Sequence, residues 1–213
     1  CSSDLITSLV DSAGRDARRA ERSGGAAQEF GAAAGLPVAG TVGLLQGAAI
    51  RRETQRAHEI RPMLEFATSA GYAPFPLLLA EARLADGDAA GATELVAGVL
   101  DGLADLPSWA RASSAALVVE VIDLLGMEPE PRDVADLTSI LTTQSGQMVV
   151  LALVAMHLGP ADRYLARLAV RAGDLDRALD RIHAARELAI AAETVLWSGW
   201  CAVDEAEIGR AHV

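Results

Sequence analysis

Lysine is absent from this chain of 213 residues, in which all 18 basic residues are arginine. This absence excludes a P-loop lysine for nucleotide phosphates, a kinase-type lysine for ATP and a Schiff-base lysine for carbonyl substrates. We therefore expect no chemistry of these three kinds within these residues.

Cysteine and long apolar runs are also scarce. The two cysteines, Cys1 and Cys201, are too few for a disulfide framework and lack the C-x-x-C spacing of a zinc or redox site. The longest apolar stretch, residues 148–158, is shorter than the roughly 20 residues that cross a bilayer. The N-terminus has no basic region followed by an apolar one. The sequence thus predicts a soluble, cytoplasmic protein.

Basic residues are fewer than acidic ones, 18 against 29, which gives a net charge of -11. Such an excess of negative charge repels phosphate backbones and anionic lipid. We therefore expect neither nucleic acid nor a membrane as a direct partner. Apolar residues make up 51% of the chain, which is enough to bury a sizeable core.

The chain opens at Cys1 without an initiator methionine. We expect it to be a fragment of a longer multidomain protein. The alternative is a lipoprotein cysteine, for which the preceding lipobox is not visible.

Apolar residues recur at three- and four-residue spacing almost everywhere, while alternating β-branched and aromatic residues are nearly absent. This pattern predicts an all-α fold. Pro62 should kink or restart a helix, and turns are expected at residues 23–25, 71–74 and 128–131. The predicted helices cover residues 4–22, 42–61, 77–86, 108–125, 132–141, 161–172, 174–189 and 194–208. A further helix follows Gly87-Asp88 and is lined by Ala92, Leu95, Val96 and Val99.

Two predicted helix hairpins share a Gly-Asp corner, at Gly87-Asp88 and at Gly173-Asp174. Superposing the corners aligns small and large apolar residues in both copies, which indicates an internal repeat. One hairpin cannot bury its own apolar face, so neighbouring hairpins must stack. We predict a single helical-repeat domain over residues 1–213. The repeat residues are Leu79, Ala80, Gly87, Asp88, Ala92, Val96, Leu165, Ala166, Gly173, Asp174, Ala178 and Ile182.

One segment departs from the helical pattern. Residues 148–154 form a continuous apolar run that Gly146 precedes and Gly159-Pro160 closes. Periodicity does not decide between a buried extended stretch and a helix buried on all sides. We favour an extended or irregular apolar insertion near residues 142–160 that packs against the repeats.

The pattern around the second corner resembles the tetratricopeptide repeat, a helix hairpin that stacks into a right-handed superhelix. The matching residues are Leu165, Ala166, Ala169, Gly173, Asp174, Ala178, Ile182 and Ala185. The copy around Gly87 is looser, with Arg83 where a small or aromatic residue is usual. The resemblance implies an all-α solenoid of tetratricopeptide-like α-α hairpins.

A longer stretch is similar to the C-terminal helical-repeat region of large actinobacterial regulators. The similar stretch comprises residues 137–141, 148–154 and 159–165 and the Gly173-Asp174-x-x-x-Ala178 turn. Such regulators also have similar residues at the positions of Trp197 and of residues 51–53. Those regulators carry a P-loop ATPase module and either a LuxR-type helix-turn-helix or a class III adenylate cyclase domain. The resemblance implies that ATP-binding, transcription-regulating or cyclase functions lie outside these residues, since their motifs are missing here.

Several residues were weighed as catalytic or metal-binding candidates. The four histidines, His58, His157, His183 and His212, are scattered without metal-ligand spacing. Residues 35–43 are interpreted as a helix-joining turn capped by Thr41, not as a phosphate cradle. Asp101 and Asp105 are interpreted as solvated surface, and Cys201 as a core residue. We therefore assign no catalytic, cofactor-binding or metal-binding residue and expect no cofactor.

Two clusters leave an alternative open. The basic cluster is either a contact for an acidic partner domain or a solvated, salt-linked helix face. Trp197 and Trp200, with Tyr164 nearby, either anchor a partner or pack against the last hairpin. The basic cluster consists of Arg15, Arg18, Arg19 and Arg22.

The function that follows is a non-catalytic sensor or protein-interaction domain of a bacterial signalling or transcriptional regulator. Its partners would be other proteins or neighbouring domains of the same polypeptide, with homo-oligomers also compatible. One alternative is a small-molecule-binding or enzymatic helical domain with a pocket inside the superhelix, recognisable by titratable side chains that converge in one deep pocket. Another is a free-standing adaptor.

Overall fold

The computed structural model describes residues 17–36, 38–54, 56–71, 74–151 and 156–212. The predicted helical class is confirmed, because helices account for 79% of the structure and the described residues contain one two-stranded sheet. No helix in these ranges is both long and apolar enough to span a bilayer. The helices are α2 (Ala17–Ala33), α3 (Val38–Glu53), η1 (Ala57–Ile60), α4 (Arg61–Ser69), α5 (Phe75–Ala85), α6 (Ala89–Gly102), η2 (Leu103–Asp105), α7 (Ser108–Leu125), α8 (Pro131–Thr142), α9 (Ala161–Arg171), α10 (Leu175–Ala191) and α11 (Val195–His212).

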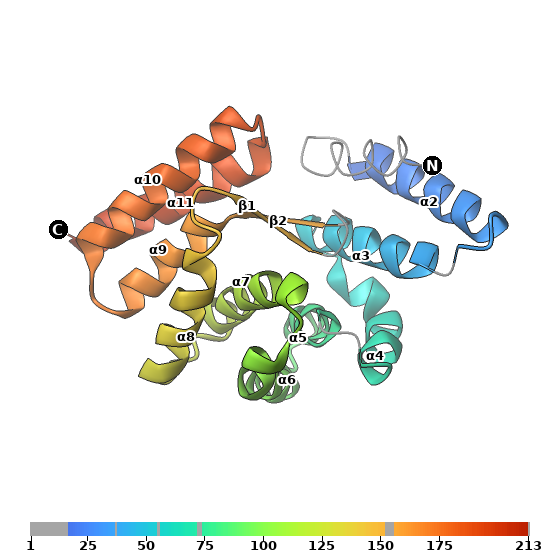
Figure 1. Ribbon diagram of the computed structural model, residues 1–213, viewed down its shortest axis with the longest axis horizontal. Coiled ribbons are helices and arrows are strands. Elements are labelled where there is room, and N and C mark those ends of the chain that lie inside the picture. The colour runs from blue at the N-terminus through green and yellow to red at the C-terminus, as the bar shows by residue number, and fades with distance from the viewer. Residues whose placement is uncertain (1–16, 37, 55, 72–73, 152–155, 213) are drawn as a thin grey trace.

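Helices that follow one another in sequence also pack on one another, as α5 does on α6, α9 on α10 and α10 on α11. In Figure 1 they trace an arc that begins with α2 on the right, passes through α4 to α7 and ends with α10 and α11 at the upper left. Strands β1 (Met148–Leu151) and β2 (Met156–Pro160) cross the inner side of this arc. They contact α7, and β2 also contacts α3 and α10.

The two Gly-Asp corners have matching geometry. Gly87 and Gly173 adopt φ angles of 82° and 75°, a left-handed conformation that glycine reaches without a steric penalty. The Asp88 carboxylate then accepts a hydrogen bond from the backbone N–H of Gly91. Asp174 does the same for Arg177, so each aspartate caps the following helix. The helix-turn-helix arrangement predicted at both corners is confirmed, because helices end at Ala85 and Arg171 and the next ones begin at Ala89 and Leu175.

The apolar repeat positions are all buried, which brings the paired helices into close contact. Small residues lie where helices approach one another, and larger ones fill the remaining space. The small ones are Ala80, Ala92, Ala166 and Ala178, and the larger ones are Leu79, Val96, Leu165 and Ile182.

The apolar insertion is a β-hairpin, so the expected extended structure is confirmed. Val149 pairs with Gly159 and Val150 with His157, with a bulge between the two pairs. Val149, Leu151 and Leu158 are buried. The run lacks a helical period because its strands lie between helices of both halves of the arc.

Three local predictions near the N-terminus are wrong. The turn at residues 23–25 does not form, because α2 continues through both glycines to Ala33. Gly24 is buried within the helix, and a Cβ on Gly25 would meet no atom within 4 Å. Farther along α2, a Cβ on Gly31 would lie 2.5 Å from the Cβ of Ala39. Thr41 is not a cap, because α3 begins at Val38. The helix predicted over 42–61 ends at Glu53.

Two further predictions concern the same region. The predicted restart at Pro62 is confirmed, since α4 begins at Arg61 with proline in its first turn. The helix expected over residues 4–22 falls mostly outside the described residues, which contain its last six positions within α2.

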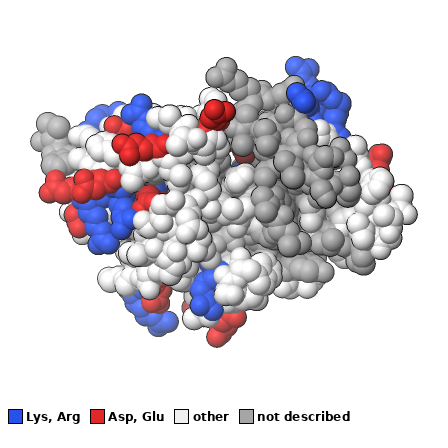
Figure 2. Space-filling model, turned by 45° about the horizontal axis from the view of Figure 1, so that its top comes forward, with Lys and Arg blue, Asp and Glu red and all other residues white. Residues whose placement is uncertain are grey.

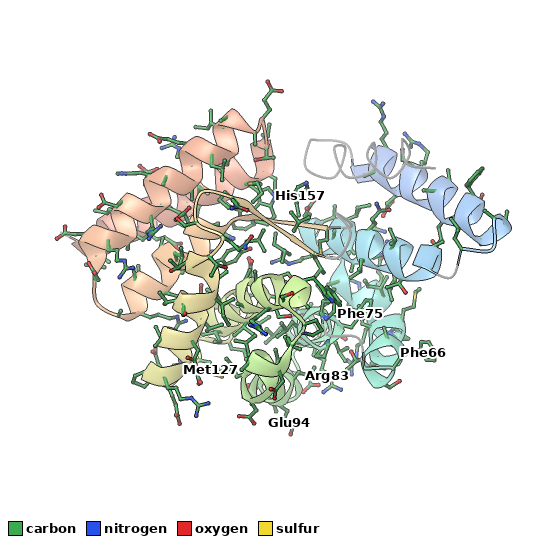
Figure 3. The ribbon with its side chains drawn as sticks, in the orientation of Figure 1. Phe66, Phe75, Arg83, Glu94, Met127 and His157 are labelled. Carbon is green, nitrogen blue, oxygen red and sulfur yellow. The ribbon has the colours of Figure 1, made fainter. Side chains whose placement is uncertain are left out.

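The surface carries charges of both signs. Acidic and basic side chains lie interspersed at the C-terminal end of the face in Figure 2, on its left. A few large apolar side chains are also exposed, such as Phe66, which projects outward from α4 (Figure 3). The mixed charges are typical of a solvated surface.

Candidate functional site

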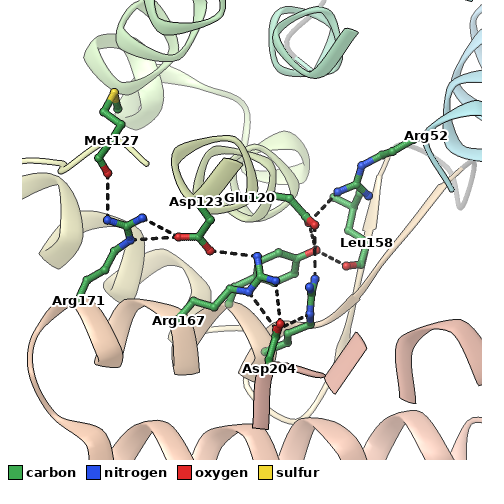
Figure 4. Close-up of polar contacts among 10 residues, drawn as sticks. Arg52, Glu120, Asp123, Met127, Leu158, Arg167, Arg171 and Asp204 are labelled. Carbon is green, nitrogen blue, oxygen red and sulfur yellow. Dashed lines mark hydrogen bonds and ion pairs between the residues drawn. The ribbon is translucent and has the colours of Figure 1, made fainter. Parts of the chain in front are cut away.

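Helix α9 presents three arginines at four-residue spacing, Arg163, Arg167 and Arg171. This spacing places them on one face, one turn apart. They meet carboxylates from α7 on one side and α11 on the other, and the resulting network is drawn in Figure 4. Arg163 is only 1% exposed, so its charge depends on these partners.

Asp204 of α11 is the shared acceptor of this network. Arg163 Nε donates to its Oδ2 over 2.8 Å, and Arg167 donates through Nε and Nη2 to both oxygens at 3.0 Å. Arg167 Nη1 also donates to Asp123 Oδ2 at 3.0 Å, and Arg171 Nη2 donates to Asp123 Oδ1 at 2.7 Å. The last helix is thereby joined through α9 to α7.

Arg52 of α3 extends the network toward the N-terminal half. Its Nε lies 2.7 Å from Glu81 Oε2 on α5, and its Nη2 lies 2.7 Å from Glu120 Oε2 on α7. The buried Tyr164 hydroxyl donates to the Leu158 carbonyl and lies 3.2 Å from Glu120 Oε2. One guanidinium therefore serves two carboxylates from different helices.

The three glutamates around Arg52 have different electrostatic environments. Burial alone would raise the pKa of Glu120, but Arg52, Arg163 and Arg167 together lower it to about 2. Burial raises the pKa of Glu81 to about 7, although Arg52 opposes the shift. Burial likewise raises the pKa of Glu53 to about 7. Glu120 is thus ionised at neutral pH, whereas Glu53 and Glu81 are only partly ionised.

A cavity of about 470 Å³ opens between α3, α5, α7 and α11. A neighbouring hollow of about 660 Å³ shares Glu120, Leu124 and Trp200 with it and continues along the α9 arginines. Helices from both ends of the chain therefore wall one concave region. The polar wall of the cavity comprises Arg52, Glu53, Glu81 and Glu120, and the apolar wall includes Leu84, Leu124, Leu196, Trp197 and Trp200.

The two tryptophans of α11 have distinct environments. Trp197 is 2% exposed and packs so tightly on Gly159 that a Cβ there would lie 2.5 Å from its ring. Trp200 is 46% exposed and lines both hollows. The Arg163 guanidinium carbon is 5.7 Å from each ring centroid, within cation–π range. Trp197 therefore packs internally, while Trp200 keeps an accessible surface.

The histidines and cysteine weighed from the sequence do not come together. His183 is exposed and lies 3.3 Å from Glu205, and His58 and His157 belong to other elements. Within the described ranges, no three His, Cys, Asp or Glu side chains gather as a metal site would require. Cys201 is buried, and burial raises its pKa to about 11, so it remains a thiol. The side chain of His212 lies outside the description.

The remaining candidates lie away from the cavity. Asp101 and Asp105 are exposed at the end of α6 and in η2. Arg18 and Arg22 are exposed on α2, whereas Arg15 falls outside the described residues. The positions of Asp101 and Asp105 agree with their interpretation as solvated surface, whereas the exposure of Arg18 and Arg22 fits both alternatives for the basic cluster.

The cavity wall can bind charged groups, but it lacks a hydroxyl or thiol nucleophile among its described residues. Its described lining residues include no histidine, cysteine, serine or threonine, and its arginine is held in ion pairs. Sequence reasoning assigned no site role to Arg52, Glu81, Glu120 or Asp204, because these residues are far apart in the sequence. Arg52 and Glu81, which are in contact, are separated by 29 positions. Glu120 and Asp204, which share Arg163 as a partner, are separated by 84 positions.

No protein-family profile matches this chain, and no curated protein or solved structure shows significant similarity to it.

Proposed function

We propose that this chain is a non-catalytic sensor and interaction domain that binds a ligand in the cavity between α3, α5, α7 and α11. Its helices would form a right-handed solenoid of tetratricopeptide-like hairpins. The matching Gly-Asp corners and the packing of successive helices support this arrangement. The resemblance to actinobacterial regulators suggests that binding is relayed to an ATPase, DNA-binding or adenylate cyclase domain outside these residues.

One observation carries the proposal: the cavity wall is built from helices at opposite ends of the chain. Arg52 and Glu53 come from α3, whereas Trp197 and Trp200 come from α11. A ligand in the cavity contacts both ends and therefore stabilises the arrangement in which they are close. Such coupling between ends is what a sensor needs in order to transmit occupancy to a neighbouring domain.

The chemistry of the wall favours binding over catalysis. Arg52 is committed to Glu81 and Glu120, and the low pKa of Glu120 keeps it from exchanging protons near neutral pH. A hydroxyl or thiol nucleophile with an adjacent base, a common arrangement in covalent catalysis, is not among the described lining residues.

A small-molecule-binding or enzymatic domain is the second candidate function. The convergence of four titratable side chains on one cavity favours a small ligand, and carboxyls with a pKa of about 7, such as Glu53, suit proton transfer. The purified chain should hydrolyse no ATP and form no cyclic nucleotide. Turnover that survives stringent purification would overturn the non-catalytic assignment.

A cavity-blocking variant tests the binding site itself. Ala85 is an exposed residue of α5 that lines the cavity, so Ala85→Trp should fill its mouth without burying a new side chain in the core. Ala97→Trp, on the exposed face of α6, is the matched control. In a thermal-shift screen of metabolites, compounds that stabilise the wild type should stabilise Ala97→Trp but not Ala85→Trp. Equal stabilisation of both variants would place binding elsewhere.

A further inference from the structure

We propose that the cavity between α3, α5, α7 and α11 binds a small organic cation, an ammonium or guanidinium group carried on a short apolar chain. This inference rests on the proposed function, which places a ligand in the same cavity, and adds the chemical class of that ligand. It follows from the charge balance, the unpartnered polar atoms and the aromatic lining of the cavity.

The polar wall has more negative than positive charge. It contains one arginine and three glutamates. Arg52 is shared between Glu81 and Glu120, and Glu120 has a second cation in Arg163 at 3.6 Å. The Glu53 side chain forms no ion pair or hydrogen bond with any described residue, although the charge of the adjacent Arg52 lowers its pKa. Above pH 7, where Glu53 and Glu81 are ionised, the three glutamates therefore outnumber the one arginine of the wall in charge.

Two buried polar atoms of the wall lack a hydrogen-bond partner among the described residues. Glu81 is 7% exposed, yet its Oε1 accepts no hydrogen bond. The indole Nε1 of the buried Trp197 donates none. Buried polar atoms are normally paired, so two unpaired ones on residues that line the same cavity suggest a partner supplied by a ligand. An ammonium or guanidinium N–H would satisfy Glu81, and an oxygen of the same ligand could accept from Trp197.

The opposite wall suits the rest of such a ligand. Trp197 and Trp200 lie three residues apart on α11, and both line the cavity. The centroids of both rings lie 5.7 Å from the Arg163 guanidinium carbon, within cation–π range, and both residues add aromatic surface to the cavity. Leu124 and Leu196 add apolar surface for an alkyl chain.

The size of the cavity points to a free small molecule. About 470 Å³ lies within the range typical of small-molecule sites. Because the pKa values of Glu53 and Glu81 are about 7, we expect a cation to bind more tightly above pH 7, where both carboxyls are ionised, than below it.

Calorimetric titrations of the full chain with three six-carbon probes test the charge requirement at pH 8. We expect n-hexylammonium to bind at least about tenfold more tightly than n-hexanol, and n-hexanoate to bind most weakly. Equal or tighter binding of n-hexanol would overturn the cationic class while leaving the cavity as an apolar binding site. Tighter binding of a decapeptide with one central arginine than of n-hexylguanidinium would overturn the small-molecule assignment.

Matched variants test the two glutamates. Glu53→Gln and Glu81→Gln preserve side-chain size, and each should weaken n-hexylammonium binding about tenfold with little effect on n-hexanol. Glu94→Gln removes the same charge from the exposed surface of α6 (Figure 3) and should bind like the wild type. Glu53→Gln disrupts no described ion pair and so provides a test even if Glu81→Gln perturbs folding. Unchanged n-hexylammonium affinity in Glu53→Gln would overturn the inference.

Discussion

Replacing Asp204 with asparagine tests how strongly the buried network holds α11 in place. Asp204 is 5% exposed and accepts hydrogen bonds from Arg163 and Arg167. Asparagine keeps the shape of the side chain but removes its charge. Arg163 would then retain Glu120 at 3.6 Å, and Arg167 would retain Asp123 at 3.0 Å.

The expected loss follows from the burial of the two guanidinium groups. Removing one partner of a buried ion pair costs roughly 3–5 kcal/mol. Because each arginine keeps one other carboxylate, we expect a value at the lower end, about 3 kcal/mol. Such a loss is a large fraction of the roughly 5–15 kcal/mol that stabilises a typical folded domain.

The neighbouring residue provides the control. Glu205 is on the same helix, and its partners Arg186 and His183 are largely exposed, so Glu205→Gln should cost less than about 1 kcal/mol. Urea unfolding followed by circular dichroism measures both variants, with an unchanged m-value indicating comparable native states. If Asp204→Asn were no less stable than Glu205→Gln, the network would not contribute as described.

Three further predictions concern packing and pH. Gly159→Ala should destabilise the native state by roughly 1–3 kcal/mol and alter tryptophan fluorescence. The reason is that Gly159 has a φ of 91° and that a Cβ there would overlap the Trp197 ring. An unchanged emission spectrum would contradict this packing. Ala178→Leu should force α9 and α10 apart at a cost of roughly 1–3 kcal/mol, and an unchanged melting temperature would count against that contact. The pKa of Glu53 rises on folding to about 7, so this residue destabilises the native state progressively as pH increases from about 4.5 to 7. In denaturant titrations, the Glu53→Gln variant should therefore be up to about 3 kcal/mol more stable than the wild type at pH 8 and about as stable as the wild type at pH 4. If variant and wild type were equally stable at both pH values, the raised pKa of Glu53 would be refuted.

Local sequence signals predicted the corners of the fold because the physics there is local. A glycine at positive φ followed by a capping aspartate needs no distant partner, so Gly87-Asp88 and Gly173-Asp174 were predictable. Gly24 and Gly25 misled the turn prediction, because α2 continues through both of them and Gly24 is buried. Here the tertiary arrangement overrides intrinsic helix propensity.

The candidate site was largely hidden from sequence reasoning. Arg52, Glu81 and Glu120 belong to three helices, and nothing within any one helix indicates that they meet. The arginines of α9 gave one usable signal, because their four-residue spacing places three charges on a single face of a helix that is otherwise mostly buried. Their acidic partners on α7 and α11 depend on the tertiary arrangement.

The most direct test of ligand binding in the cavity uses the three tryptophans as internal probes. Trp197 and Trp200 line the cavity, whereas Trp109 is exposed at the start of α7 and does not line it. Indole N–H signals can be followed by NMR while n-hexylammonium is added. We predict that the Trp197 and Trp200 signals shift with one common dissociation constant and that the Trp109 signal stays in place. Signals of Trp197 and Trp200 that stay unchanged at saturating ligand, or that shift no more than that of Trp109, would contradict the account.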